Sequence, residues 1–406
     1  MKLKYLFFII ALSLLFIENG FSQNIETRGR LSNSVYFLEK TDIDASSGAT
    51  QLARIYQYFR FTARIREYND LSLNISARAL TDTEAELSSE ERFRAYRLSL
   101  SASKLFKGLL DFELGRQFLH PGIPFGSLDG LNLLVRPASN FEWQLFGGVE
   151  SHLQRSFKVY EFDDATVFGS ALKFRNFYDG DIQLAYLHKR SRNEDQWQIA
   201  GMNISNRYFD PVSFLIQAHY DLVNERFHRL YLSTHYRVSD DLNFYLRLKQ
   251  QYPQIYGDSF FRIFEFEAYS QAGLGFNYAL SENYSVGANY TLIQLDDGDG
   301  HRVVTDFSNR NGSIGFVYET GDLGDQLSLL FDYGYEILPD LMASLSVDYT
   351  RYRFEEIYDY ENQLANALRL SYKFTRHLRA DLEYQWLNNR FKDSDQRLLN
   401  HIHYIW

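Results

Sequence analysis

The sequence predicts an all-β protein, a single closed antiparallel β-barrel that crosses a membrane with about 20 strands (range 18–22). Three observations predict this class. Apolar side chains recur at every second residue, in segments of about ten residues, from residue 25 to the end of the chain. Short polar turns alternate with long polar loops. The chain also contains 30 Tyr and 34 Phe, and membrane barrels carry aromatic girdles at both interfaces.

The first 22 residues are predicted to be a secretory signal peptide. Lys2 and Lys4 precede an apolar stretch at 5–17, and 20–22 supplies small residues at the spacing of a cleavage site. The apolar stretch is shorter than the roughly 20 residues that a transmembrane helix needs. We therefore expect cleavage after residue 22, export, and a barrel over residues 23–406 in the bacterial outer membrane.

The barrel strands are predicted from a period of two, because side chains of a strand point alternately to its two faces. Residues 71–79 place Leu, Ile and Ala on one face and Ser, Asn and Arg on the other, and 341–350 repeats this pattern. The predicted strands are 25–38, 52–65, 71–80, 93–103, 109–117, 130–136, 141–150, 166–174, 182–190, 195–205, 212–221, 226–236, 242–251, 265–278, 284–294, 309–318, 326–335, 341–352, 362–374, 378–387 and 397–406.

That number of segments is odd, whereas single-chain bacterial barrels have an even number of strands. The conflict lies between residues 295 and 325. We predict that 309–318 is a hairpin arm within a long external loop, which leaves about 20 strands.

The connections predict which end of the barrel faces outward. Tight turns are expected at 66–70, 104–108, 136–140, 237–241 and 279–283, and longer loops at 39–51, 81–92, 118–129, 151–165 and 252–264. Outer-membrane barrels have short periplasmic turns and long extracellular loops. The long loops are therefore predicted to be extracellular.

The last strand ends on an aromatic residue. Ile402, Tyr404 and Trp406 lie on one face, and His401 and His403 lie on the other. This ending resembles the C-terminal strand by which bacterial outer-membrane barrels are recognised and inserted. The resemblance implies that Ile402, Tyr404 and Trp406 are an insertion signal and that the barrel-assembly machinery is a partner.

Gly115, Arg116 and Gln117 end the fifth predicted strand and lead into loop 118–130. This segment resembles Gram-negative porins of the general and alginate-export types, in which a third external loop folds into the lumen. The resemblance implies that loop 118–130 is the constriction; the alternative is an external loop stiffened by its two prolines. Arg116 falls on the face of Leu114, so either a bulge turns it inward or it lies at the rim.

Arginines gather on the predicted lumen face of the early strands, where the alternate residues are apolar. Arginine at the lipid midplane would cost about 2–4 kcal/mol, so these residues belong inside. Facing acidic groups, they would set up a field that selects solutes by charge; the alternative is that they pair with carboxylates of the wall. The candidate pore-lining residues are Arg54, Arg60, Arg64, Arg78, Arg97 and Arg116, with Asp111, Glu113 and Asp129 as opposing carboxylates.

Composition and missing motifs exclude several other functions. With no Cys there are no thiolate metal sites, and the net charge of −10 disfavours nucleic acid as a partner. The sequence has no H-E-x-x-H, G-x-S-x-G or Walker motif. We expect no enzymatic activity, cofactor or metal.

The function predicted from these features is a passive diffusion channel for small hydrophilic solutes, anions or saccharides among them. A barrel of this width leaves either a water path or a plugged lumen, and no plug domain is apparent. The alternative is a non-conducting barrel that serves as a rim enzyme, an adhesin or a scaffold for a surface complex. Outer-membrane lipid and lipopolysaccharide are the expected surroundings.

Overall fold

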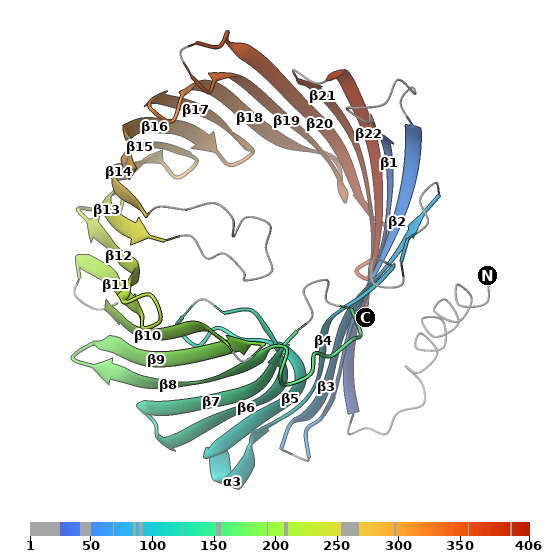
Figure 1. Ribbon diagram of the computed structural model, residues 1–406. Helices are drawn as coiled ribbons and strands as arrows, with labels where there is room; N and C mark the ends of the chain where they lie inside the picture. The colour runs from blue at the N-terminus through green and yellow to red at the C-terminus, as the bar shows by residue number, and fades with distance from the viewer. Residues whose placement is uncertain are drawn as a thin grey trace.

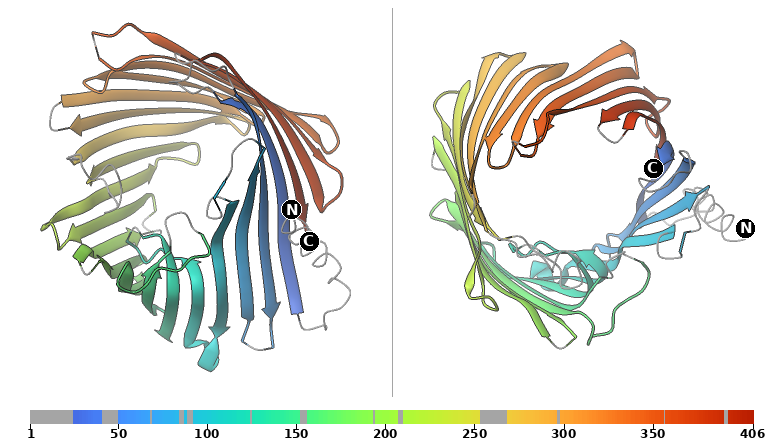
Figure 2. Two further views of the ribbon diagram at one scale, coloured as in Figure 1. Left: turned by 45° about the vertical axis from the view of Figure 1, so that its right-hand side comes forward. Right: turned by 45° about the horizontal axis from the view of Figure 1, so that its top comes forward.

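The protein is a closed antiparallel β-barrel in which each strand pairs with the next along the chain and β1 pairs with β22 (Figures 1 and 2). The computed structural model describes residues 25–40, 50–67, 69–83, 87–88, 92–123, 125–151, 156–192, 194–206, 210–252, 268–295, 298–355, 357–389 and 392–406. The predicted signal peptide at 1–22 lies outside these residues.

The barrel has 22 strands. In chain order they are β1 (Ile25–Lys40), β2 (Thr50–Ile65), β3 (Leu71–Asp82), β4 (Phe93–Lys104), β5 (Leu110–Phe118), β6 (Ser127–Ala138), β7 (Phe141–Glu150), β8 (Thr166–Phe177), β9 (Gly180–Ser191), β10 (Glu194–Asn206), β11 (Val212–Asp221), β12 (Arg226–Arg237), β13 (Leu242–Gln251), β14 (Tyr269–Ser281), β15 (Tyr284–Leu295), β16 (Gly298–Asn309), β17 (Gly312–Gly321), β18 (Asp325–Leu338), β19 (Leu341–Arg353), β20 (Glu361–Lys373), β21 (Leu378–Asn389) and β22 (Lys392–Ile405). A single short turn, α3 (Leu105–Gly108), joins β4 to β5.

The predicted closed barrel is confirmed, and its 22 strands lie at the upper limit of the predicted range of 18–22, slightly above the central value of about 20. The region 298–321 forms two full wall strands, β16 and β17, rather than an arm within an external loop. Asn309 closes the tight turn between them, because its Oδ1 accepts hydrogen bonds from the backbone N–H groups of Asn311 and Gly312. Alternation is weak in β16, where Val303 and Val304 are adjacent and polar residues occupy both faces, so the sequence did not show this strand.

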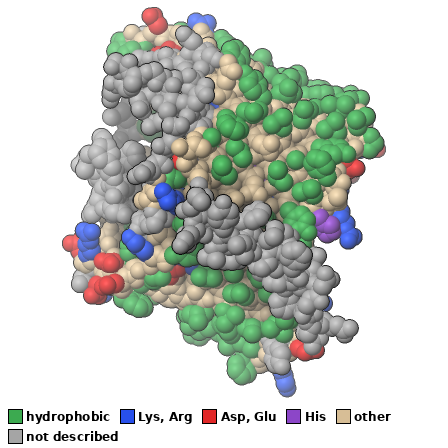
Figure 3. Space-filling model, turned by 90° about the vertical axis from the view of Figure 1, so that its right-hand side faces the viewer, with side chains coloured by type: hydrophobic (Ala, Val, Ile, Leu, Met, Phe, Trp, Pro, Cys, Tyr) green, Lys and Arg blue, Asp and Glu red, His purple; other side chains and the backbone are tan. Residues whose placement is uncertain are grey.

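The two faces of the wall differ as membrane strands require. Large apolar side chains such as Leu98, Leu184 and Leu329 are exposed on the outward face. Figure 3 shows hydrophobic side chains spread over the side of the barrel that carries β1, β2 and β22. A surface of this kind is covered by lipid in a bilayer.

The barrel closes where β1 meets β22 over the register from Arg30↔Ile405 to Phe37↔Leu398. The backbone of Trp406 extends this pairing, because Gly29 and Trp406 exchange N–H···O hydrogen bonds of 3.2 Å in both directions. The indole ring lies over Gly29, where a Cβ atom would come 1.9 Å from Trp406 Cζ2. Only glycine leaves room for the ring at this point of the seam.

No helix among the described residues is long and apolar enough to cross a membrane.

Candidate functional site: the inner wall of the barrel

Strand register places the early arginines side by side on the inner wall. Arg30 pairs with Arg60 across β1 and β2, and Arg78 pairs with Arg94 across β3 and β4. Residues paired across a sheet point to the same face. Ser76 separates Arg60 from Arg97 in the next row. The predicted cluster therefore occupies one continuous patch, and it also includes Arg30 and Arg94.

Part of this patch is neutralised by carboxylates. Arg54 Nε lies 2.8 Å from Asp82 Oδ2, and Arg97 Nη2 lies 2.6 Å from Glu113 Oε1. Arg78 stacks over the Tyr56 ring, with its Cζ atom 5.3 Å from the ring centroid. The two ion pairs and the stacking contact hold these three side chains against the wall.

The other arginines of the patch have no compensating carboxylate among the described residues. Within the described part of the chain, no ion pair neutralises Arg30, Arg60, Arg64 or Arg94. We name these four residues the first cationic stripe. Among the described residues, Arg30 hydrogen-bonds to the uncharged or weakly basic side chains of Ser32 and His403.

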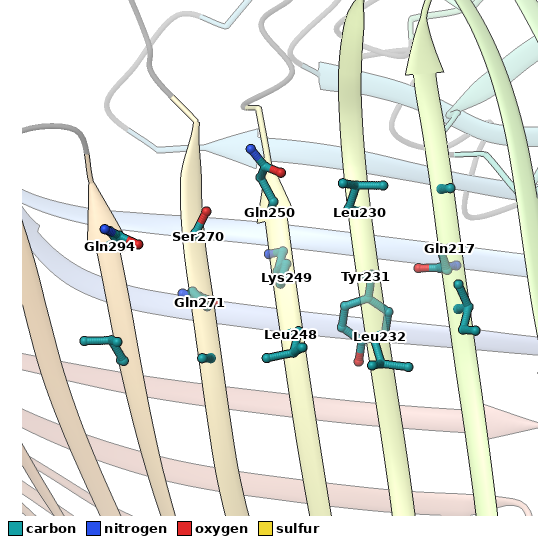
Figure 4. Close-up of a pocket in the computed structure, with 14 residues that line it drawn as sticks. Gln217, Leu230, Tyr231, Leu232, Leu248, Lys249, Gln250, Ser270, Gln271 and Gln294 are labelled. Atoms are coloured by element: carbon teal, nitrogen blue, oxygen red, sulfur yellow. The ribbon is translucent and has the colours of Figure 1, made fainter.

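A second group of cations lies on β12 and β13. Arg229, Arg247 and Lys249 share the inward face with Tyr231 and Tyr245, and we name these three cations the second cationic stripe. Figure 4 shows Tyr231, Lys249 and Gln271 at one level on adjacent strands of the wall. Each cation stacks on a tyrosine, with Arg247 Cζ 5.0 Å from the Tyr245 centroid and Lys249 Nζ 4.7 Å from that of Tyr269.

The second cationic stripe also lacks a carboxylate within ion-pair distance, as far as the described residues extend. Sequence reasoning did not select these three residues as a site. The signal was present, because residues 242–249 alternate cleanly and place Arg247 and Lys249 opposite a row of leucines.

The wall from β16 to β22 has a different charge pattern. Arg302 pairs with Glu319, and Arg369 Nε lies 2.6 Å from Glu383 Oε2. The side chain of Arg369 is 50% exposed although it points inward, while Glu383 is largely buried beneath it. Carboxylates therefore compensate these two inward arginines, and among the described residues the inward positive charge without a carboxylate partner lies on β1–β4 and β12–β13.

The described residues of loop 119–126, which are 119–123 and 125–126, lie against the inside of the wall and do not project from the rim. Gln183 Nε2 donates to Pro121 O at 3.1 Å, and Asn203 Nδ2 donates to Gly122 O at 2.7 Å. Both donors lie on the inward face, opposite the exposed Leu184 and Met202. The loop is thus tied to β9 and β10 across the lumen side.

Apolar packing holds this loop in place. Leu119 and Ile123 are buried against inward residues of β6–β10, among them Leu128, Val167 and Leu187. These inward positions are apolar because the loop covers them, which is a departure from the polar lumen face expected elsewhere.

Arg116 and Asp129 lie away from the lumen, contrary to their prediction as pore-lining residues. Arg116 pairs with Leu98 in register and stays on the outward face, and a bidentate pair of two 2.6 Å hydrogen bonds joins it to Asp129. Gly115, at φ +113°, allows the strands to approach closely here, but it does not turn Arg116 inward.

Residues 156–158, in the loop between β7 and β8, cover the Arg116–Asp129 pair. The backbone carbonyl oxygens of Ala95, Ser156 and Lys158 accept the remaining guanidinium hydrogens, and Arg116 is only 5% exposed. The pair fastens loop residues 156–158 over the outside of the rim.

The other two predicted carboxylates have local partners. Glu113 pairs with Arg97 inside the barrel, as described above. Asp111 lies near the periplasmic end, where its Oδ2 atom is 2.7 Å from Arg136 Nη1. Neither carboxylate faces the arginines from across the lumen, so the opposed acidic side that we expected does not form from these residues.

Histidines and serines join the strands at the seam. His401 Nδ1 lies 2.7 Å from Ser34 Oγ, and His403 Nδ1 lies 2.8 Å from Ser32 Oγ. His403 also approaches Asp381, but Ser32 is buried and its oxygen accepts a hydrogen bond from Arg30. This geometry links β1 to β22 and does not present a free serine nucleophile. Over the described residues, no cluster of three or more acidic or histidine side chains could hold a metal ion.

No family model matches the sequence, and no curated protein matches it. Solved structures with a similar fold include a BenF-like porin from Pseudomonas fluorescens, 10% identical, covering 95% of this chain and 100% of that one with a TM-score of 0.45. OccAB2 of Acinetobacter baumannii is 13% identical, covers 94% of this chain and 98% of that one, and has a TM-score of 0.43. The translocation pore of the P pilus usher PapC is 8% identical, covers 94% and 99%, and has a TM-score of 0.48.

Proposed function

We propose that this barrel is a passive channel for small hydrophilic solutes in the bacterial outer membrane, with a preference for anions. The single observation that carries the proposal is the two cationic stripes on the inner wall. A barrel of this strand number is wider than side chains alone can fill, and charges that line a confined aqueous path select solutes by sign.

The position of loop 119–126 supports a narrowed lumen. The loop occupies space on the side of β6–β10, next to the second cationic stripe, and its packing keeps it there. A solute that passes the loop would therefore travel between the two stripes.

Swelling of liposomes that contain the purified protein tests this proposal. Glucose, glucuronate and glucosamine have similar size and differ in charge. We expect swelling in the order glucuronate, glucose, glucosamine, and no swelling with heat-denatured protein. The absence of swelling above empty liposomes would exclude the channel, and faster entry of glucosamine would exclude the anion preference.

We also propose that the protein reaches the membrane as an exported precursor cleaved after residue 22 and is inserted by the barrel-assembly machinery. The position of Ile402, Tyr404 and Trp406 on the outward face of the closing strand supports this role. N-terminal sequencing of the mature protein from outer membranes tests the cleavage, with Gln23 as the expected first residue.

A further inference from the structure

A pocket of about 720 Å³ opens at the extracellular end of β17, β18 and β19. It lies on the outward face, because Arg351 pairs with Leu327 and this row continues the exposed Leu329 and Tyr349. The pocket is therefore separate from the lumen. Tyr318, Asp325, Arg351, Arg353, Phe354 and Tyr360 supply its most distinctive side chains.

Tyr360 is fixed in the pocket by two guanidinium groups and one hydrogen bond. Its ring centroid lies 4.4 Å from Arg351 Cζ and 4.7 Å from Arg353 Cζ, and its hydroxyl donates to Asp325 Oδ2 at 3.0 Å. This hydrogen bond raises the pKa of the Tyr360 phenol above its ordinary value, so the ring stays neutral. The result is an ordered aromatic surface at the edge of the pocket.

Asp325 organises the other polar groups. Its Oδ1 atom accepts from Thr320 Oγ1 at 2.7 Å, and its Oδ2 atom lies 2.7 Å from Arg353 Nε. Arg351 is exposed, and no described carboxylate forms an ion pair with it. Donors on Arg351 and acceptors on the exposed Glu355 therefore remain available to a ligand.

The lining excludes two classes of ligand. Two guanidinium groups, of Arg351 and Arg353, face three carboxylates, of Asp322, Asp325 and Glu355, so the pocket does not favour a simple anion. An acyl chain fits poorly because charged and amide groups line much of the surface, and burying unpaired polar groups is costly.

A sugar satisfies this lining. Its hydroxyl groups both donate and accept hydrogen bonds, and the C–H faces of its ring pack on aromatic side chains. Tyr318, Phe354 and Tyr360 expose 44%, 66% and 40% of their surface, and the volume lies in the range of ordinary ligand sites. We propose that this pocket is a saccharide-binding site on the membrane-facing rim of the barrel.

The position of the pocket along the barrel axis, relative to the membrane interface, indicates the source of the saccharide. Along the outward face of β19 the apolar run Leu345, Val347 and Tyr349 changes to Arg351 and Arg353, which marks the membrane interface. Sugars occur at this level in the head groups of outer-leaflet glycolipids and in free oligosaccharides of the medium, and both present the same chemistry to the pocket.

Binding of two probes to the full-length protein in detergent tests the proposal. The probes are intact lipopolysaccharide from a Gram-negative bacterium and its lipid-free core oligosaccharide, with affinity measured by thermophoresis. Tyr360→Ala and Arg351→Ser should each weaken binding by about tenfold or more, as truncation of an aromatic or arginine anchor does. Tyr278→Ala and Arg376→Ser are matched controls, because both residues are exposed outside the pocket.

Loss of binding of either probe in the pocket variants but not in the controls supports the site. If the lipid-free oligosaccharide binds, a soluble saccharide is a sufficient ligand for the pocket. If only the intact lipopolysaccharide binds, the ligand is the sugar head group of a membrane-anchored glycolipid. Failure of both probes to bind the wild-type protein, or equal affinity in wild-type and pocket variants, overturns the proposal. Unchanged far-UV circular dichroism and heat-modified gel mobility establish that each variant is folded.

Discussion

Arginine has two different functions in this wall, and the face on which it lies decides which. Inward arginines such as Arg30 and Arg60 are exposed to the lumen, and no described carboxylate forms an ion pair with them. Arg116 faces outward, where water is excluded, and a carboxylate and three carbonyl groups satisfy it. Arginine therefore contributes to the electrostatic potential of the lumen on one face, and on the other it stabilises the wall through a buried ion pair and hydrogen bonds.

Removal of two charges from the first cationic stripe should change ion selectivity. In the variant Arg60→Ser with Arg94→Ser, the reversal potential in a salt gradient should move toward cation preference, because ions in a pore respond to charges within about one Debye length, roughly 10 Å. Arg376→Ser, on a periplasmic turn, is the matched control and should leave the potential unchanged. An unchanged potential in the double variant would show that these arginines do not control selectivity.

Removal of the buried guanidinium should weaken the barrel. Arg116→Met leaves the Asp129 carboxylate without its partner, and loss of one member of a buried pair costs about 3–5 kcal/mol. Urea unfolding in lipid vesicles measures this loss. The double variant Arg116→Met with Asp129→Leu should recover most of the stability, and failure to recover would show that the carbonyl contacts of loop 156–158 matter more than the pair.

Alternation alone assigns Arg54, Arg60, Arg64 and Arg78 to one face of the sheet, and the strand register places them on that same face. It could not assign Arg94, because the register between β3 and β4 shifts after Ser76 and the count of alternating residues fails there. It also could not find the loop carbonyl groups that bury Arg116, since those contacts join residues 40 or more positions apart.

At the scale of elements, two close contacts hold the barrel in shape, one inside the wall and one at the seam. Loop 119–126 is fixed by the fit of Ile123 over Gly201, and the closing strand is fixed by the fit of Trp406 over Gly29. Both fits depend on the missing side chain of glycine. A sequence alone shows the glycines but not the side chains that fill the space above them.

Filling the space at Gly201 should displace the loop. A Cβ atom there would come 2.9 Å from Ile123 Cγ1 and 3.0 Å from His219 Cδ2. Gly201→Val is therefore expected to release loop 119–126 from the wall and to raise conductance or its fluctuation in single-channel recordings. Gly147→Val is the control, because the nearest atom to its Cβ is 3.7 Å away; identical recordings for both variants would contradict a fixed loop.

Filling the space at Gly29 should slow barrel closure. Gly29→Val forces the Trp406 ring away from β1, so the rate of folding into lipid vesicles, followed by heat-modified gel mobility, should fall. Trp406→Ala in the same chain removes the clash and should restore part of the rate. If Gly29→Val folds at the wild-type rate, the ring position at the seam is unimportant for closure.

At the scale of the whole molecule, charge is distributed unevenly around a closed wall. On the inner wall, and among the described residues, positive charge without a carboxylate partner lies on β1–β4 and β12–β13, whereas ion pairs compensate Arg302 and Arg369 on β16 and β20. The fold class and the inward position of the early arginines followed from alternation, while the strand number required the pairing of β16 with β15 and β17. The net charge of −10 describes the chain, but solutes in the lumen respond to the local pattern.

We propose that this wall encloses a water path whose charge selectivity is set by the two cationic stripes. Recording from the purified protein in planar lipid bilayers tests it most directly. We expect stable conductance steps and, in a salt gradient, a reversal potential whose sign shows anion preference. A protein that is folded and inserted but shows no steps at any voltage, or steps with clear cation preference, would contradict it.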